Sequence, residues 1–203
     1  MDFAQANKIY DALYSKVSGR NLSLAGRETN QYKSKSFVYG EVVPHSFYQI
    51  LKDLGVQPGQ VFYDLGSGTG KAVVLANLLF DFSESIGIEF VESLYQCSVD
   101  IQTRLDKEFK PKVRPKQQFG KMTFIHGSFL DVDVSNADVI FMNSTCFQED
   151  LMLALDEKLQ EVKPGTLLIT LSKTLKSPCF QMYRHQLYEF SWKEATVFFH
   201  RKI

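Results

Sequence analysis

The pattern of apolar and polar positions predicts that strands and helices alternate over most of the chain. Short runs that are almost wholly apolar are typical of strands buried in a parallel sheet, and apolar residues spaced three or four apart indicate helices. The runs predict strands at 60–63, 85–89, 122–126, 137–142, 166–171, 186–191 and 195–201. The spacing predicts helices at 3–18, 44–54, 69–79, 91–109 and 148–162. This order predicts an α/β fold that closes with a β-hairpin.

Two polar segments interrupt the alternation. Residues 18–36 are polar and contain two glycines, which predicts a mobile loop. Lys110 to Lys116 holds two prolines and four cations, and we interpret it as an exposed insertion loop rather than a phosphate-binding patch. The chain therefore divides into an N-terminal helix and loop appendage, 1–36, and a main domain, 37–203.

Composition narrows the class of protein. With 203 residues the chain suits one domain with a full core. The 23 basic and 23 acidic residues cancel, so no global field draws it to nucleic acid or to a membrane surface. Three irregularly spaced cysteines and four scattered histidines match neither a disulfide framework nor a metal site, which indicates a reducing compartment and no bound metal. The first residues lack a basic-then-apolar leader, and no apolar run is long enough for a membrane span, so we expect an intracellular protein.

The stretch from Val61 to Lys71 carries the strongest chemical signal. An apolar strand runs into a G-x-G-x-G turn formed by Gly66, Gly68 and Gly70, which lets a ligand approach the backbone closely. The dinucleotide fingerprint has its third glycine one place later. Asp64, two positions before the first glycine, would repel a pyrophosphate. A ligand with an ammonium and a sulfonium fits better, and we therefore expect S-adenosylmethionine.

A second acid strengthens this interpretation. Glu89 follows the next strand about 20 residues after the turn, where α/β nucleotide-binding units place an acid on the ribose hydroxyls. Asp64, Ser128 and Asn143 also lie at strand ends, the edge of a doubly wound sheet where ligands collect. Together these residues predict a cofactor that contains a nucleoside, and NAD is the weakest alternative to S-adenosylmethionine.

Several motifs together resemble a known family, the disruptor-of-telomeric-silencing (Dot-one) histone lysine methyltransferases. They are Val38-Tyr39-Gly40-Glu41, Asp64-Leu65-Gly66-Ser67-Gly68-Thr69-Gly70, Gly87-Ile88-Glu89, Gly127-Ser128-Phe129-Leu130 and Val139-Ile140-Phe141-Met142-Asn143. The resemblance spans about residues 37–201. It implies a class I methyltransferase (Rossmann-like) fold with a doubly wound, mostly parallel, seven-stranded sheet and a C-terminal antiparallel hairpin. It also implies methylation of a lysine on the core of histone H3, hence a chromatin regulator in the nucleus.

The resemblance also implies roles for individual residues. Tyr39 and Glu41 would close over the methionine part of the cofactor, whose amino-acid end Asp64, Gly66 and Gly68 would hold. Lys71 stands where the family commonly has glutamine. Glu89 would bind the ribose, and Phe129 would lie beside the adenine. Asn143 would lie at the junction of the methyl donor with the lysine channel and would form the catalytic pair with Tyr39. Phe147 and Trp192 would be walls of that channel.

Three departures from the family pattern affect these roles. Ser128 stands where the family usually has an aspartate that accepts from the adenine amino group. Asn143 is not followed by the second asparagine and phenylalanine of better-known members. Phe199 replaces a channel tyrosine, which removes a hydroxyl and keeps an apolar wall.

Alternative functions remain open at this point. The balanced charge favours a methyltransferase of a non-histone protein or of a small-molecule amine, because nucleosome binding usually needs a basic footprint. Such an enzyme would act in the cytoplasm. The other alternative is a catalytically silent module that binds the cofactor and acts through partners.

Overall fold

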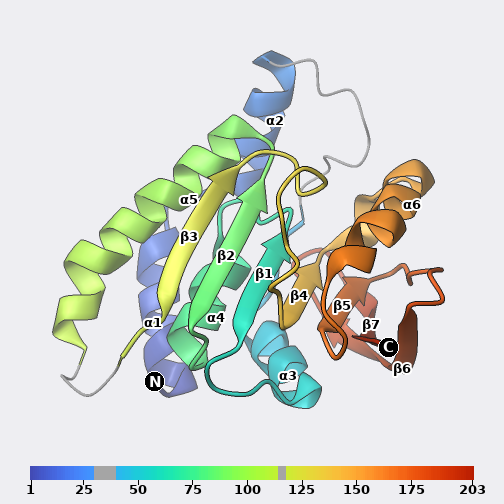
Figure 1. Cartoon of the computed structure of the whole chain (residues 1–203). Coiled ribbons are helices and arrows are strands. Elements are labelled where there is room, and N and C mark those ends of the chain that lie inside the picture. The colour runs from blue at the N-terminus through green and yellow to red at the C-terminus, as the bar shows by residue number, and fades with distance from the viewer. Residues whose placement is uncertain (30–39, 114–117) are drawn as a thin grey trace.

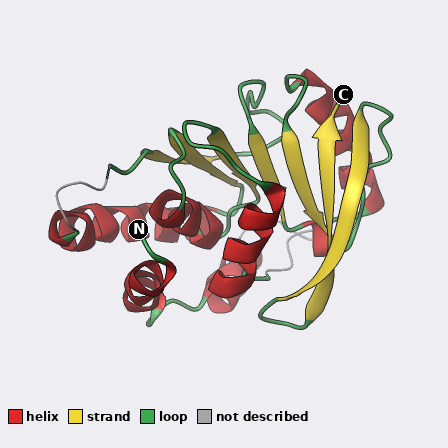
Figure 2. Ribbon diagram, turned by 90° about the horizontal axis from the view of Figure 1, so that it is seen from below, coloured by secondary structure: helices red, strands yellow, loops and turns green. Residues whose placement is uncertain are grey.

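The chain folds around one seven-stranded sheet with helices on both faces (Figures 1 and 2). The computed structural model describes residues 1–29, 40–113 and 118–203. The strands are β1 (Val61–Leu65), β2 (Glu84–Glu89), β3 (Lys121–His126), β4 (Val139–Met142), β5 (Leu167–Leu171), β6 (Phe180–Glu189) and β7 (Glu194–Lys202). The α-helices are α1 (Phe3–Tyr14), α2 (Gly19–Thr29), α3 (Pro44–Leu54), α4 (Lys71–Leu79), α5 (Glu92–Arg104) and α6 (Glu149–Lys158).

The strand order is β3-β2-β1-β4-β5-β7-β6, which confirms the fold expected from the sequence. Strands β1 to β5 are parallel, and β7 pairs antiparallel with both β5 and β6. The strand order reverses between β1 and β4, because the chain first builds outward through β2 and β3 and then returns to the other side of β1. Ligands of doubly wound sheets bind at such a switch point, outside the carboxyl ends of the strands.

Two hydrophobic cores cover the two faces of the sheet. Side chains alternate along β1, so that Phe62 packs with α3 and α4 on one face, whereas Tyr63 and Leu65 pack with α6 on the other. On the first face Phe47 of α3 meets Phe62 and Phe141 edge to face, with ring centroids 6.1 and 5.4 Å apart. Both faces of the central strands are therefore dry, as their continuous apolar sequence predicts.

The N-terminal helix α1 is fastened to this framework. The Asp2 carboxylate caps it by accepting a hydrogen bond from the Gln5 N–H at 2.8 Å. Leu13 is fully buried in the first core, and the Arg104 guanidinium of α5 donates to the Leu13 carbonyl at 2.9 Å. Helix α1, expected as an appendage, thus contributes to the main core. The expected division at residue 36 falls outside the described residues.

The loop predicted at 18–36 is wrong over its first part, because α2 occupies Gly19–Thr29. This helix packs on the start of α5 through small residues. Ser23 is fully buried, a side chain on Gly26 would come within 2.4 Å of the Ser93 hydroxyl, and Ser93 donates to the Leu22 carbonyl at 2.9 Å. A packing face made of serine and glycine produces no apolar periodicity, so the sequence pattern did not show it.

Other boundaries differ where helices and strands end in exposed residues. Helix α5 stops at Arg104 and continues as a π-helical turn, Leu105–Phe109, within the helix predicted at 91–109. A 3-10 turn, Lys110–Lys112, follows where the exposed insertion loop was expected to start. Strand β6 starts six residues earlier than predicted. The sequence did not show these residues as a strand, because most of them face solvent and lack an apolar alternation. Among the described residues, no helix is long and apolar enough to cross a membrane.

We predict that Phe47→Ala destabilises the protein by about 3–5 kcal/mol, because it leaves a cavity between α3 and the sheet. Phe47 is 0% exposed and contacts two other aromatic rings. The free energy of unfolding from urea denaturation measures the effect. Leu153→Ala is the control: Leu153 is 51% exposed on α6, and we expect a change within about 0.5 kcal/mol. Equal losses for the two variants would contradict the packing described for α3.

Candidate active site

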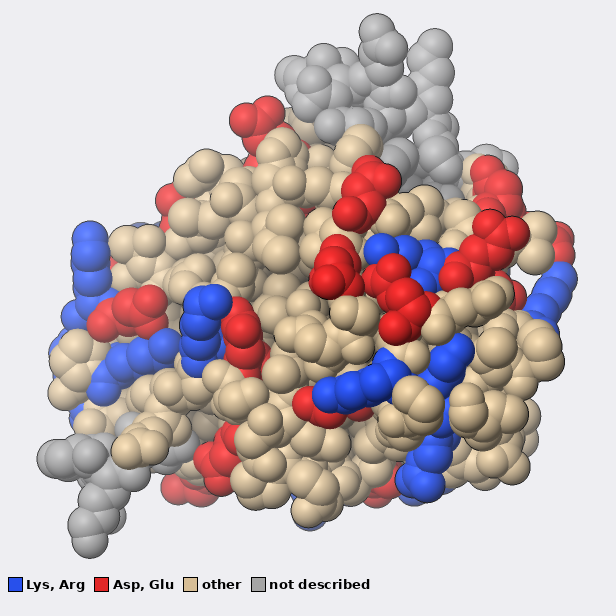
Figure 3. Space-filling view, in the orientation of Figure 1, with Lys and Arg blue, Asp and Glu red and all other residues tan. Residues whose placement is uncertain are grey.

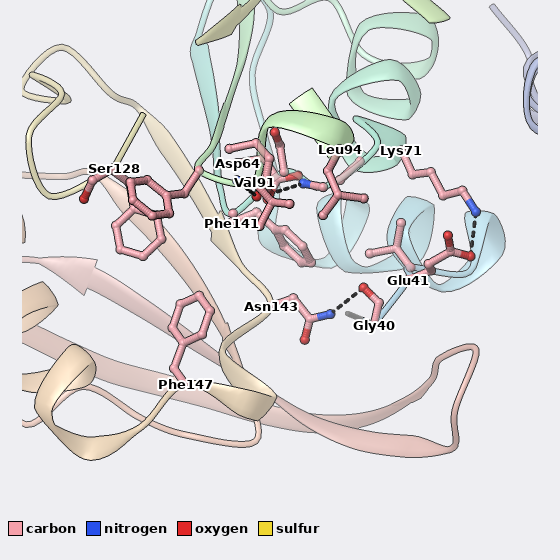
Figure 4. Close-up of a pocket in the computed structure, with 18 of the residues that line it drawn as sticks. Gly40, Glu41, Asp64, Lys71, Val91, Leu94, Ser128, Phe141, Asn143 and Phe147 are labelled. Carbon is pink, nitrogen blue, oxygen red and sulfur yellow. Dashed lines mark hydrogen bonds and ion pairs between the residues drawn. The ribbon is translucent and has the colours of Figure 1, made fainter. Parts of the chain in front are cut away.

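A pocket of about 290 Å³ opens at the carboxyl ends of β1, β2 and β4, at the switch point of the sheet (Figure 4). Its lining brings together nearly all of the site residues expected from the sequence. The lining residues are Gly40, Glu41, Val42, Asp64, Gly66, Ser67, Gly68, Lys71, Ala72, Glu89, Phe90, Val91, Leu94, Ser128, Phe129, Phe141, Asn143, Phe147 and Leu151.

The glycine turn forms the floor between β1 and α4. The N–H groups of Gly66 and Ser67 donate to the Ile88 carbonyl at 2.9 and 3.0 Å, which ties the turn to β2. Gly66 and Gly70 have φ of 89° and 82°, a left-handed conformation that favours glycine. A side chain on Gly70 would also meet the Phe124 ring at 2.6 Å. The turn is therefore restricted to glycine for both conformational and steric reasons.

Glu89 is buried at the end of β2 and holds the turn in place. Its carboxylate accepts hydrogen bonds from the Gly68 N–H at 2.7 Å and from the Val91 N–H at 2.8 Å. Burial raises the pKa of Glu89, although these backbone hydrogen bonds act in the opposite direction. A carboxylate fixed by two backbone donors at a pocket wall is a precise acceptor for ligand hydroxyl groups.

Asp64 is a second buried carboxyl group in the same wall. It lies at the end of β1, is 4% exposed, and has its pKa raised well above the usual value by burial and by the charge of Glu89. Two neighbouring buried acids disfavour a ligand anion at this point. A ligand cation, or a set of hydroxyl donors, would instead relieve the cost of their charge.

Glu41 and Lys71 form an ion pair at another side of the pocket. Lys71 Nζ lies 2.6 Å from Glu41 Oε2, and the two side chains are 12% and 24% exposed. Glu41 Oε1 is buried and has no hydrogen-bond partner among the described residues. Figure 4 shows this pair and Ser128 at opposite ends of the pocket, so the ion pair lies at one end of it.

Asn143, at the end of β4, joins the pocket to the C-terminal hairpin. Its Nδ2 donates to the Gly40 carbonyl at 3.1 Å, and its Oδ1 is buried without a partner among the described residues. A side chain on Gly40 would come within 2.8 Å of the Trp192 ring. Glu41 is tied to the link before Trp192, because its N–H donates to the Ser191 hydroxyl at 3.4 Å. The structure thus gathers Gly40, Asn143 and Trp192 from three distant segments.

Aromatic rings line the end of the pocket near Ser128. Phe129 and Phe147 are stacked with ring centroids 5.8 Å apart. Phe90, which follows Glu89 directly, is 40% exposed although it lines the pocket. An exposed aromatic ring next to a buried acid is suited to stacking on a flat heterocycle.

Three expected site residues are not among the described residues that line the pocket. Tyr39 lies outside the described residues. Phe199 is fully buried in the first core, where it packs against Tyr183, Tyr188 and Arg184, and it is not among the described lining residues. Trp192 adjoins the pocket through Gly40 but is not one of the described lining residues either.

The sequence did not indicate several lining residues. Phe90, Val91, Leu94 and Leu151 give the pocket most of its additional apolar surface. Only Phe90 had a local signal, its position directly after the acid of the second strand. Within the described residues no cluster of His, Cys, Asp and Glu side chains could hold a metal ion.

Comparison with known proteins places these features in context. The family model described as "Histone methylation protein DOT1" matches residues 20–194. A Caenorhabditis elegans protein named "Histone-lysine N-methyltransferase, H3 lysine-79 specific" is 34% identical over 146 residues, 68% of this chain and 15% of that protein. A protein of the same name from Eremothecium gossypii is 30% identical over 145 residues, 70% of this chain and 25% of that protein. The chain therefore spans a quarter or less of the length of these relatives.

Solved structures with the same fold are more distant in sequence. TrmN from Thermus thermophilus superposes with a TM-score of 0.63 at 16% identity, over 83% of this chain and 52% of that one. An RNA methyltransferase from Salinibacter ruber, solved with S-adenosyl-L-homocysteine, has a TM-score of 0.56 at 19% identity, over 75% and 87% of the two chains. At these identities the likeness concerns the fold.

We predict that Asp64→Asn stabilises the ligand-free protein at neutral pH. The raised pKa of Asp64 means that its charged form opposes folding, and this cost appears as the pH rises through that pKa. Below the ordinary aspartate value of 3.8 the group is protonated in both the folded and unfolded states, so the cost is absent. The variant should therefore have the higher free energy of unfolding at pH 7, with the difference shrinking as the pH falls.

Urea denaturation at a series of pH values measures this difference. Asp131→Asn, at an exposed position, is the matched control and should not reproduce the trend. A lower stability of Asp64→Asn than of the wild type at pH 7 would show that the carboxylate charge is satisfied in the folded protein.

Proposed function

The chain belongs to the DOT1 family of histone methylation proteins, and on that premise we propose that it is an S-adenosylmethionine-dependent protein lysine N-methyltransferase that acts on a histone. One observation supports this most directly. Asp64 and Glu89, two buried carboxyl groups on adjacent strands, line the same pocket as Asn143 and Phe147. The pocket thus combines groups suited to a nucleoside with groups suited to an amine acceptor.

The residues at the pocket fit this cofactor from end to end. Glu89, held by the N–H groups of Gly68 and Val91, would accept hydrogen bonds from the ribose hydroxyls. Asp64 would accept from the ammonium of the methionine part, whose positive charge offsets the repulsion between Asp64 and Glu89. The adenine would lie among Phe90, Ser128 and Phe129, with backbone groups in place of the aspartate that relatives commonly have. When bound, the cofactor supplies a methyl group on a sulfonium.

The chain itself mainly positions and dehydrates the acceptor amine. Methyl transfer is an in-line displacement, so alignment and exclusion of water account for most of the rate. Phe147, Phe141 and Leu151 make the wall beside Asn143 apolar, which lowers the pKa of an entering lysine ammonium and favours its neutral form. The Oδ1 of Asn143, which has no hydrogen-bond partner among the described residues, can accept a hydrogen bond from that amine and orient its lone pair.

A histone acceptor is proposed from the relatives. The relatives are named for histone H3, and such an activity would place the protein in the nucleus. The basic segment Lys110 to Lys116, expected to be the only local cationic patch, lies partly outside the described residues.

One observation favours a different acceptor. The basic and acidic residues are equal in number, and Figure 3 shows both kinds interspersed over the face that it draws. Nucleosome binding usually requires a strongly basic surface. A non-histone protein or a small-molecule amine is therefore the second candidate, and a module that binds cofactor without turnover is the third.

We expect the purified chain to transfer label from methyl-labelled S-adenosylmethionine to nucleosomes or core histones. Parallel reactions should contain other proteins and small amines. Label in a histone H3 lysine, located by mass spectrometry, would support the proposal. Label only in small amines would contradict it, and tight cofactor binding without turnover on any substrate would indicate the silent module.

We further predict that Asn143→Ala lowers the turnover number by about 100-fold, because the acceptor amine loses its orienting hydrogen bond. Glu89→Gln should instead raise the KM for the cofactor by about tenfold or more, since a charged acceptor for the ribose hydroxyls is lost. Initial rates at varied cofactor concentration separate the two effects. Asn21→Ala, at an exposed position on α2, is the control and should behave like the wild type. Normal turnover of Asn143→Ala would remove Asn143 from the acceptor site.

A further inference from the structure

Lys71 is held in an environment that a lysine rarely occupies without a functional reason. It is the first residue of α4, at the end of the helix where the macrodipole disfavours a cation. It lines the pocket, and its side chain is only 12% exposed. The ammonium group is therefore costly in this position unless nearby groups compensate for its charge.

Two tyrosines of α1 supply part of this compensation. Lys71 Nζ lies 5.2 Å from the centroid of the Tyr14 ring and 5.9 Å from that of Tyr10, within the range of cation–π attraction. The two rings pack on each other, with centroids 4.8 Å apart. Burial, together with the charges of Glu41 and Asp11, raises the pKa of Tyr10, so its ring stays neutral beside the ammonium. Both tyrosines are buried.

The same helix also contacts the glycine turn. The Tyr14 hydroxyl donates to the Thr69 carbonyl at 3.1 Å, two residues before Lys71. Helix α1 therefore contacts both the backbone of the glycine turn just before α4 and the side chain of the first residue of α4. Residues 3–14 precede the segment matched by the family model, which starts at residue 20, so this contact lies outside what the family model describes.

We propose that α1 completes the ligand pocket, with Tyr10 and Tyr14 as positioning residues that hold the Lys71 ammonium as the counter-ion for a ligand carboxylate. This inference rests on the proposed cofactor, whose amino-acid end carries such a carboxylate. Lys71 has three N–H donors and, within the part of the chain that the structure describes, gives one to the carboxylate of Glu41, which leaves two for a ligand anion. Figure 4 shows Lys71 at the end of the pocket opposite Ser128, where the amino-acid end would lie if the base occupies the aromatic end.

Two ligands that differ only at the amino-acid end test the proposal. S-adenosylhomocysteine carries the ammonium and the carboxylate, whereas 5′-deoxy-5′-methylthioadenosine has the same nucleoside and a thioether without them. Affinities of the full chain for both compounds are measured by titration calorimetry. We expect Lys71→Gln to lower the affinity for S-adenosylhomocysteine by about tenfold or more and the affinity for methylthioadenosine by less than about twofold.

The tyrosine variants test the role of α1. Tyr10→Leu and Tyr14→Leu should each lower the affinity for S-adenosylhomocysteine by about 3- to 10-fold. The affinity for methylthioadenosine should stay within about twofold of the wild-type value. Tyr10→Phe keeps the ring and should retain the wild-type affinity. In a Lys71→Gln background, neither leucine substitution should lower the affinity for S-adenosylhomocysteine further, because the ammonium group that the rings hold is absent.

Two controls separate positioning from folding. Ile9→Ala on the same helix removes packing without touching Lys71, so it should lower the Tm and leave the ratio of the two affinities unchanged. Methylthioadenosine binding shows that each variant still forms the pocket. Equal weakening of both ligands by the tyrosine variants, or an undiminished effect in the Lys71→Gln background, would overturn this inference alone. Failure of the wild type to bind either compound would overturn the proposed cofactor and the inference with it.

Discussion

Two buried acids on neighbouring strands set the conditions for the rest of the pocket. Because Leu65 of β1 pairs with Ile88 of β2, Asp64 and Glu89 lie close together at the carboxyl edge of the sheet. Burial raises the pKa of both groups, and the charge of Glu89 raises the pKa of Asp64 further. Backbone N–H groups satisfy Glu89, which requires the turn to bring Gly68 within 2.7 Å of its carboxylate. The conformation of the glycine turn and the start of α4 follow from this requirement.

The elements of the central sheet could be predicted because each strand carries its own signal. β1, β4 and β5 are buried on both faces, so their sequences are almost continuously apolar, and the turn after β1 is marked by its glycines. Helix α2 was missed because its contact with α5 uses Ser23 and Gly26, whose small size allows close packing without hydrophobicity. The local sequence pattern is therefore a good predictor of burial against large side chains. It is a poor predictor of contacts in which two backbones pack closely.

The site residues also differ in how far the sequence could predict their positions. Asp64, Glu89 and the glycines belong to one βα unit and its neighbour, so their spacing along the chain predicts their spacing in space. Phe199 was placed at the channel by counting from Trp192, but adjacent residues of a strand face opposite sides of the sheet. Phe199 pairs with Ile169 of β5, and both side chains lie in the first core. The contacts of Lys71 with α1 likewise arise from packing between distant segments, for which a single sequence holds no signal.

The pairing of Gly40 with Asn143 has a consequence for how the protein assembles. The hydrogen bond joins residues 103 positions apart, and the contact of Glu41 with Ser191 spans 150 positions. Closing such long loops is entropically costly, so these contacts form only once most of the chain has collapsed. A nascent or truncated chain that lacks the last hairpin would contain the glycine turn but would lose the contacts that Ser191 and Trp192 make with Glu41 and Gly40 at the pocket. A ligand that needs the whole pocket will therefore bind only fully folded molecules and will draw the folding equilibrium toward them.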